Sequence, residues 1–378
     1  MNLAQLSLKC FSLLLPLLAI SVTACQSLTI QPSPPAPEVR SDTQLVLNNA
    51  ILQQSNQEDN TVWKIKADNI VYSEDKQTAA LSQIVGNLWQ DDSIILKVSA
   101  KRGKIKDNGN TILLNEEVIV SDPRNNSVIN SDALEWRPQD NILLIEEALR
   151  GTHPNLEVTA NSGIYLTDVE QLVVQGDVVA TTDQPSLQLT SDRLEWSISQ
   201  NKVNSPGAIK LARYDAAQNI TEKLVSDRAE VDLIAHTATL NQNVELITAA
   251  PQLQIATELF IWNYQQRRGN AEKPIQILDR EQQIVLTGNQ GEINLQQQLA
   301  ILDNGVKGIN PQQDLELYAQ KLTWKITANM LEATGNIVYQ QASPPARLTG
   351  EKAVGNLSNN NIVVTGNGQK QVQTVIDN

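Results

Sequence analysis

The octapeptide Leu189-Thr190-Ser191-Asp192-Arg193-Leu194-Glu195-Trp196 contains the pattern that decides the fold. An aliphatic residue stands two positions before a small residue, and core-type residues follow three and five positions after it. The pattern occurs ten times, and its small residues are Ala67, Ala100, Ser131, Ala160, Ser191, Ser226, Thr257, Gly288, Ala319 and Gly350. Their spacing is 29 to 35 residues, most often 31. This period predicts a repeat architecture in which each unit packs on its neighbours.

Within each copy the apolar residues alternate with a period of two, which predicts a β-strand. The alternation changes parity at the small residue, so positions −2 and 0 share one face, and positions +3 and +5 share another. We therefore predict a bulge or corner at each small residue, and a sheet that is folded along its length. Further strands are expected between the copies, at 83–89, 113–120, 172–180, 239–247, 299–308 and 331–339.

Odd and even copies differ in the size of their side chains. The odd copies carry an aromatic residue at +5, namely Tyr72, Trp136, Trp196, Trp262 and Trp324. The even copies carry a small residue at +3, namely Gly103, Gly163, Ala229, Gly291 and Ala353. We interpret this alternation as two opposed walls, one bulky and one slim, in which the glycines leave space opposite the aromatic wall. The alternative is a closed core in which the same residues pack on one another.

Composition excludes several classes of function. The 378 residues include 29 Lys and Arg against 42 Asp and Glu, a formal net charge of −13, so a nucleic-acid binder is not expected. Two His and two Cys leave little material for a metal site or a nucleophile–base pair. His153 and His236 are interpreted as surface histidines. We expect no catalytic residue, no cofactor and no metal ion, and hence no enzyme.

The N-terminus is interpreted as a targeting segment. Residues 1–24 carry Lys9 and then an apolar run too short to span a membrane, which is typical of a signal peptide. The run ends in Val22-Thr23-Ala24-Cys25, which resembles the lipobox of bacterial lipoproteins, where the Cys is acylated. An uncleaved signal anchor is the alternative. Residues 25–42 would then form a lipid anchor and a Pro-rich tether.

Several motifs resemble, in order, those of the LptC family, the periplasmic component of the lipopolysaccharide-export ABC transporter. They are Asn49-Ala50-Ile51-Leu52-Gln53-Gln54, Trp63-Lys64-Ile65-Lys66-Ala67, Gly86-Asn87-Leu88, Ala100-Lys101-Arg102-Gly103 and Ser131-Asp132-Ala133-Leu134-Glu135-Trp136. Later copies are similar to both LptC and the related LptA/OstA strands. The resemblance implies an all-β fold: an elongated β-jellyroll of two opposed antiparallel sheets, open along one side, here built from about ten 31-residue repeats. It divides the array into an LptC-like part at 43–211 and an LptA/OstA-like continuation at 212–378.

The resemblance also implies that an apolar groove shelters lipid acyl chains. The candidate groove residues are Ile65, Ala67, Ile70, Tyr72, Val98, Ala100, Gly103, Ile105, Ile129, Leu134, Trp136, Val158, Gly163, Tyr165, Leu189, Leu194, Trp196, Trp262, Gly291 and Trp324. Edge strands at the two ends would add to a partner's sheet. Their candidate residues are Leu45, Leu47 and Ile51, which are expected to share one face, and Ile362 and Val364.

The expected function is lipopolysaccharide transport from the inner to the outer membrane, as the periplasmic bridge of an ABC export system. The partners would be lipopolysaccharide, an LptB/LptF/LptG-type transporter at the N-terminal edge, and an LptA- or LptD-type jellyroll at the C-terminal edge. The protein is expected in the periplasm, held to a membrane by Cys25 or by an uncleaved anchor, with the inner membrane favoured. The alternative is a structural or adhesive β-solenoid lipoprotein without lipid cargo.

Overall fold

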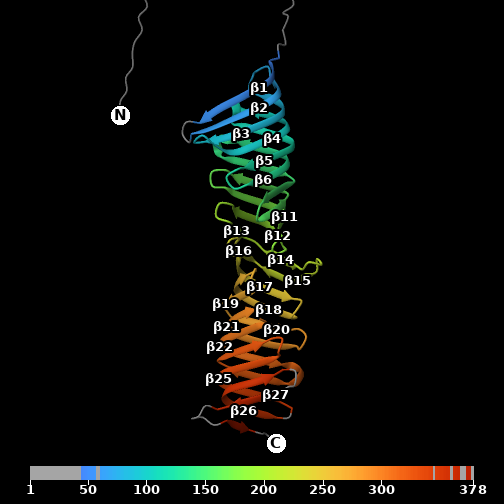
Figure 1. Ribbon diagram of the computed structural model, residues 1–378, viewed down its shortest axis with the longest axis vertical. Coiled ribbons are helices and arrows are strands. Elements are labelled where there is room, and N and C mark those ends of the chain that lie inside the picture. Colours follow the sequence, from blue (N-terminus) through green and yellow to red (C-terminus); the bar gives the residue numbers. More distant parts are fainter. Residues whose placement is uncertain (1–43, 57–59, 344, 358–360, 367–371, 376–378) are drawn as a thin grey trace, which may run out of the picture. The chain divides into compact units, whose positions relative to one another are not determined.

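Long antiparallel strands follow one another from layer to layer in the computed structural model, which describes residues 44–56, 60–343, 345–357, 361–366 and 372–375. The colours of Figure 1 change steadily from blue to red along the stack, because each strand pairs mainly with strands close to it in sequence. The described residues contain 28 strands in a single hydrogen-bonded sheet. This confirms the prediction of an all-β, elongated jellyroll, and residues 43–378 form one compact unit.

Thirteen of the 28 described strands contain the repeated pattern. They are β2 (Thr61–Tyr72), β4 (Ser93–Lys106), β6 (Ser127–Arg137), β9 (Leu156–Ala160) with β10 (Ser162–Leu166), β12 (Leu187–Ser197), β15 (Ile220–Ser226) with β16 (Arg228–Asp232), β18 (Leu253–Asn263), β21 (Ile284–Asn294), β23 (Leu315–Ala319) with β24 (Lys321–Lys325), and β26 (Ala346–Asn356).

The other strands run in the opposite direction. They are β1 (Val46–Asn56), β3 (Ala79–Gln90), β5 (Thr111–Asp122), β7 (Ile142–Glu147) with β8 (Leu149–His153), β11 (Gln171–Thr182), β13 (Lys202–Ser205) with β14 (Ile209–Tyr214), β17 (Thr237–Thr248), β19 (Arg268–Ala271) with β20 (Ile275–Asp279), β22 (Leu299–Asn310), β25 (Met330–Gln341), and β27 (Asn361–Thr365) with β28 (Gln373–Val375). They include all six strands that were expected between the copies. Single 3-10 turns occupy Asp107–Gly109, Pro138–Asp140 and Pro311–Gln313.

Each layer bends in its middle, so the sheet has two walls. The first half of β6 pairs with β8 and its second half pairs with β7. The same division continues along the array. We call the ladder through β8, β9, β14, β15, β20, β23 and β28 wall 1, and the ladder through β7, β10, β13, β16, β19, β24 and β27 wall 2. The two walls meet at a corner on one side, and their turns face one another on the other side, which we call the mouth.

The corner confirms the predicted bulges. Pairing shifts register there, for example between Asn115 and Val118 and between Gln175 and Val178. Residues with positive φ stand at the shifts, including Gly176 at 80° and Gly335 at 79°, where glycine avoids the steric cost of a side chain. The small residues at position 0 also bond locally: the Ser226 hydroxyl donates to the carbonyl oxygen of Arg228 at 3.0 Å. The serine side chain is therefore small enough for the bend, and its hydroxyl also stabilises the bend through this hydrogen bond.

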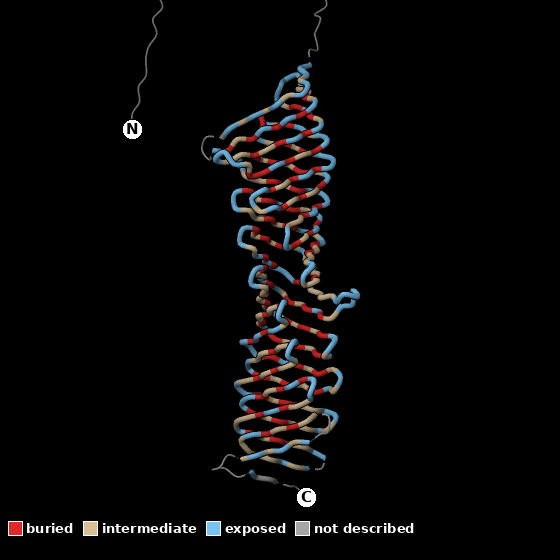
Figure 2. Tube along the Cα trace, in the orientation of Figure 1, coloured by how far each residue is buried: buried red, intermediate tan, exposed pale blue. Residues whose placement is uncertain are grey.

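Positions −2 and 0 lie in wall 1, and positions +3 and +5 lie in wall 2. Buried residues recur on every layer between the walls, whereas most turn residues are exposed (Figure 2). The interpretation of one bulky and one slim wall is wrong, because bulky and small copies alternate along wall 2 itself. Trp136 of β6 and Gly163 of β10, for example, both lie in this wall, with β7 between them.

The proposed boundary between residues 211 and 212 falls inside β14, which pairs with β12 before it and β15 after it. The segments 1–24 and 25–42, together with Cys25, lie outside the described residues. Within the described part of the chain, no helix is long and apolar enough to cross a membrane. The same residues contain no group of three or more His, Cys, Asp or Glu side chains placed to hold a metal ion.

Candidate functional site

The space between the walls is apolar from the first layers to the last. Of the candidate groove residues, all are buried there except Tyr72, Gly103 and Gly291, which are half-buried. Apart from the three glycines, they belong to or pack against one continuous cluster of buried side chains, in which Trp136 and Trp324 are fully enclosed. The structure therefore brings the candidate residues together in one interior.

The interior is filled at the glycines that were expected to leave space. A Cβ at Gly163 would lie 2.6 Å from Leu149 Cδ1, and a Cβ at Gly103 would lie 2.5 Å from Ile84 Cδ1. Gly291 would meet Ile275 Cγ2 at 2.9 Å. These neighbours are aliphatic side chains and not the expected aromatic wall. The prediction of a gap at these three positions is wrong, because aliphatic residues of nearby layers occupy the space.

Two small cavities lie between the walls in the described part of the chain. One, of about 60 Å³, lies near the C-terminal end and is lined by residues that include Leu286, Leu317, Leu331 and Ile362. The other, of about 50 Å³, lies at mid-array. Each cavity has room for a few water molecules, and its volume is far smaller than a fatty acyl chain needs. A chain could enter only if the walls moved apart.

The mouth is closed at one place by a buried polar cluster. Tyr165 of β10 donates its hydroxyl proton to Asp122 at the end of β5, at 2.6 Å. Arg124 pairs with Asp122 at 2.5 Å and donates to the carbonyl oxygen of Thr167 at 2.8 Å, across the mouth. Burial, reinforced by the Asp122 charge, raises the pKa of the Tyr165 hydroxyl above its usual range, so it stays a donor. We call this group the first clamp.

A second clamp closes the mouth further along. Glu222 of β15 is 2% exposed and receives hydrogen bonds from Arg213 Nε at 3.0 Å and from Arg267 Nε at 2.5 Å. Arg267 comes from the opposite edge, in the turn after β18, and Arg213 also donates to the carbonyl oxygen of Tyr264 there. Because a buried carboxylate needs compensating charge, these two arginines offset the cost of burying Glu222 between the walls.

A third contact across the mouth is uncharged. Gln282 Nε2, in the turn before β21, donates to Asn329 Oδ1 at 2.8 Å, and its amide also reaches Asp279 Oδ2 at 3.2 Å. A concavity of about 640 Å³ surrounds this contact, lined by turns of both walls. The mouth is therefore held at separate points, with open stretches between them.

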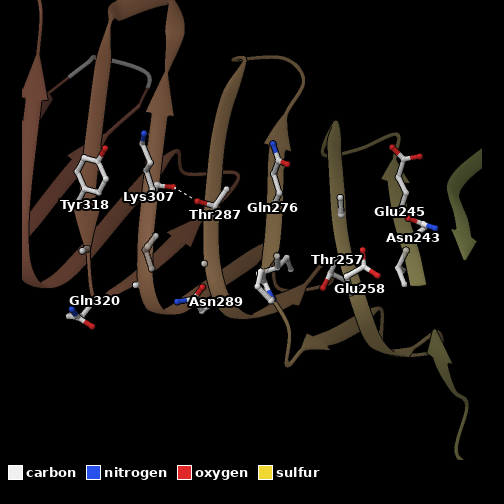
Figure 3. Close-up of a pocket in the computed structure, with 18 of the residues that line it drawn as sticks. Asn243, Glu245, Thr257, Glu258, Gln276, Thr287, Asn289, Lys307, Tyr318 and Gln320 are labelled. Carbon is white, nitrogen blue, oxygen red and sulfur yellow. Dashed lines mark hydrogen bonds between the residues drawn. The ribbon is translucent and has the colours of Figure 1, made fainter. Parts of the chain in front are cut away.

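The outer face of wall 1 carries a wider and different concavity of about 850 Å³. Figure 3 shows its polar lining on successive strands, from Glu245 through Gln276 and Thr287 to Lys307 and Tyr318. Lys307 lies 5.2 Å from the Tyr318 ring centre and 3.1 Å from a Glu316 oxygen. This outer groove offers amides, hydroxyls and charges, so it does not suit a hydrocarbon chain.

The two ends of the array expose strand edges. β1 pairs only with β2 among the described strands, and β27 only with β26. Leu47 packs on the core, but Ile51 is 65% exposed, so the expectation that they share one face is wrong. Asn49, with φ of 47°, lies at the bend of β1, where the alternation reverses, and the pairing with β2 keeps one register across it, from Asn48 with Asn69 to Ala50 with Ala67. Leu45 is exposed, and Ile362 and Val364 pack partly on the core.

Residues 12–144 match the family model described as lipopolysaccharide-assembly, LptC-related. This part of the chain is similar to the LptC-related family. The LptC-related family indicates a role in lipopolysaccharide transport, and it is not a family of enzymes. No protein in the curated collection searched matches the chain.

The LptC-related segment ends at residue 144, inside β7, so it holds the first layers and half of the first clamp. Tyr165 and Thr167, which complete that clamp, lie beyond the match, as do the second clamp and both cavities. The fold continues without a break past the match, because β7 pairs with β10 in the next layers. The sequence analysis missed the clamps: their members are 43 to 51 residues apart, and no local motif marks them.

Proposed function

We propose that the chain is the periplasmic bridge of a lipopolysaccharide-export system, carrying lipid from an inner-membrane ABC transporter toward the outer membrane. The LptC-related segment is the observation that carries this proposal. The continuous two-walled sheet supports it, because an apolar interior that runs through every layer gives acyl chains a continuous path.

Transfer of an acyl chain into the interior has a large driving force. Shielding from water is worth about 0.8 kcal/mol per CH₂, or about 10 kcal/mol for a chain of about 14 carbons. That gain would offset the free-energy cost of separating the walls. The walls must separate because the cavities of about 60 and 50 Å³ are too small for an acyl chain. Similar aliphatic surfaces in every layer favour sliding, since no layer offers a deep pocket that would trap the lipid.

The free edges would join the bridge to its neighbours. β1 and β27 each leave one row of backbone groups unpaired within the described sheet, and such rows accept a further strand. We propose that β1 docks the LptB/LptF/LptG-type transporter and that β27 docks an LptA- or LptD-type jellyroll. We further propose that the protein lies in the periplasm, preferably at the inner membrane, attached through an acylated Cys25.

A photo-crosslinker at the C-terminal cavity tests the cargo. Ile362 lines this cavity, and the next residue of β27, Val363, is 57% exposed on the outer face. With benzoylphenylalanine at Ile362, irradiation of cells should yield a lipopolysaccharide adduct, whereas the same probe at Val363 should not. Equal labelling of both positions, or of neither, would contradict the proposal.

The filled interior favours a second candidate, a structural or adhesive β-solenoid without cargo. Its specific support is the close contact of Leu149 with Gly163 and of Ile84 with Gly103, because a permanent groove would leave these positions open. This candidate requires that no adduct forms at Ile362 in cells where the protein is present and folded.

A further inference from the structure

The outer face of wall 1 carries exposed apolar side chains in its first layers. Strand pairing places Ile51 of β1, Lys66 of β2, Val85 of β3, Ser99 of β4 and Ile119 of β5 in one row across the sheet. Ile51 is 65% exposed, Val85 56% and Ile119 44%. In the described part of the chain, no later member of this row is an exposed large hydrophobic residue. Exposed apolar residues gathered in this way mark an interaction site.

The same face is locally basic. Lys66 lies in the apolar row, and Lys64 and Lys97 lie in the next row toward the mouth. All three are exposed, and the ion pairs that lysines form in the described chain involve other lysines. The remaining polar members of the two rows, from β1 to β5, are amides and serines. An uncompensated positive face therefore stands out on a chain whose net charge is −13.

A tryptophan completes this surface. Trp89 of β3 is half-buried in the third row, between Val62 of β2 and Ile94 of β4. Lys64 Nζ lies 5.8 Å from the centre of its ring, which is a cation–π contact. We call the group the basic patch, and its members are Ile51, Lys64, Lys66, Val85, Trp89, Lys97 and Ile119. Aliphatic, tryptophan and lysine side chains together are typical of a surface that meets lipid head groups.

The charges indicate the occupant. A second copy of the patch would bring like charges together, so self-association through this face is disfavoured. An anionic bilayer offers negative phosphates above an apolar layer, which complements both kinds of side chain. The chain outside the described structure also leads there, because Cys25 stands 19 positions before Gln44, the first described residue. A Pro-rich chain of that length spans up to about 60 Å.

We propose that the basic patch docks the first layers on the surface of an anionic phospholipid bilayer, the membrane that holds Cys25. The lysines of the patch contact lipid phosphates, and its aliphatic residues reach the boundary of the acyl layer. Because the patch lies on the side of the stack and not on its end, docking lays these layers along the membrane. The mouth and the free edge of β1 stay accessible.

The contact goes beyond the proposed function. A bridge must point away from the membrane that anchors it, so the docked arrangement belongs to the chain while β27 has no partner. Docking is therefore a resting position, and it does not depend on what the interior carries. A structural solenoid without cargo would dock in the same way.

Fluorescence at Val85 tests the contact. Full-length protein with an environment-sensitive fluorescent amino acid at this position is reconstituted into vesicles whose head groups carry a spin-label quencher. Vesicles of phosphatidylglycerol and phosphatidylcholine in equal parts should quench the fluorescence, and vesicles of phosphatidylcholine alone should not. The matched position is Ile164, which is 40% exposed on β10 of wall 2 and should stay unquenched in both.

Variants separate charge from apolar contact. Lys64→Gln with Lys97→Gln should lower the docking equilibrium about thirtyfold, because each lysine near an anionic surface contributes about fivefold. Lys202→Gln with Lys325→Gln removes the same charge from wall 2 and should change the equilibrium by less than about twofold. Ile119→Thr should weaken docking several-fold, at high salt as well as low. All five positions are exposed, so the urea midpoint of each variant should match the wild type.

The contrary results are specific. Equal quenching at Val85 in the two kinds of vesicle would overturn the role of charge, and quenching in neither would overturn docking itself. Equal losses in the two lysine pairs would overturn the location. Quenching that needs an LptB/LptF/LptG-type transporter in the vesicle would assign the patch to a protein partner. The lipopolysaccharide adduct at Ile362 is independent of all these outcomes, so failure of docking and failure of the proposed function are told apart.

Discussion

Gly163→Ala measures directly whether the interior is filled. The new Cβ would lie 2.6 Å from Leu149 Cδ1 and 3.0 Å from the Val173 carbonyl oxygen, against an optimal carbon–carbon separation of about 3.5–4.0 Å. Leu149 is 2% exposed, so its side chain has no free space to move into. We expect a loss of about 1–3 kcal/mol in the free energy of unfolding, which is typical of overpacking.

The matched control is Gly207→Ala, between β13 and β14, where a Cβ would meet no atom within 4 Å. Its stability should be unchanged or up to about 1 kcal/mol higher, through the smaller entropy of the unfolded chain. Because an array unfolds in local units, stability should be measured both by urea denaturation and by hydrogen exchange of the amides of β8 and β10.

A double variant identifies the clash. Leu149→Ala removes the side chain that Gly163→Ala meets, so the losses from the two substitutions should be less than additive, with a coupling of about 1 kcal/mol or more. If Gly163→Ala is as stable as the wild type and its amides are equally protected, the filled interior is refuted and an open groove at this layer is restored.

Other predictions concern the second clamp, His153 and the lipid anchor at Cys25. Glu222→Gln should cost about 2–3 kcal/mol in urea denaturation, because it removes the charge that two inward arginines share, whereas Glu230→Gln, in an exposed ion pair, should stay within about 0.5 kcal/mol; equal effects would refute the clamp. The lowered pKa of His153 means that the unfolded chain binds its proton first, so stability should fall as the pH drops below about 6.5, and His153→Gln should flatten that fall; an unchanged pH profile would contradict it. Cys25→Ser should leave the signal uncleaved and abolish metabolic fatty-acid labelling, and normal processing would refute the lipoprotein hypothesis.

The bends of the sheet were predictable because their cause is local. The parity change at Ser131 or Ser191 is visible in eight consecutive residues, and the register shifts follow it. The reversal of the alternation at Asn49 was not predicted, because β1 precedes the repeats and has no second copy to compare with. The dipeptides Gly176-Asp177 and Gly335-Asn336 lie at the corner, whereas Gly86-Asn87 pairs regularly within β3.

The contents of the interior were not predictable in the same way. Whether Gly163 faces a gap or Leu149 depends on which layers of the two walls lie opposite one another. The repeat pattern alone does not give this offset between the walls. The same offset decides that Glu222 meets Arg267. In the sequence, charged residues in turns look like ordinary surface residues. They form a clamp only because the turns of wall 1 and wall 2 meet across the mouth.

The contacts across the mouth join residues separated by 43 to 51 positions, nearly the same distance each time. A layer is therefore complete as soon as about fifty further residues are available, and no part of the described array waits for the far end of the chain. Because contacts of short sequence separation form fast, this protein can fold in order, from the N-terminal layers onward, while later residues are still being delivered. A chain cut short at the C-terminus would then keep its earlier layers and lose only the last unclosed one.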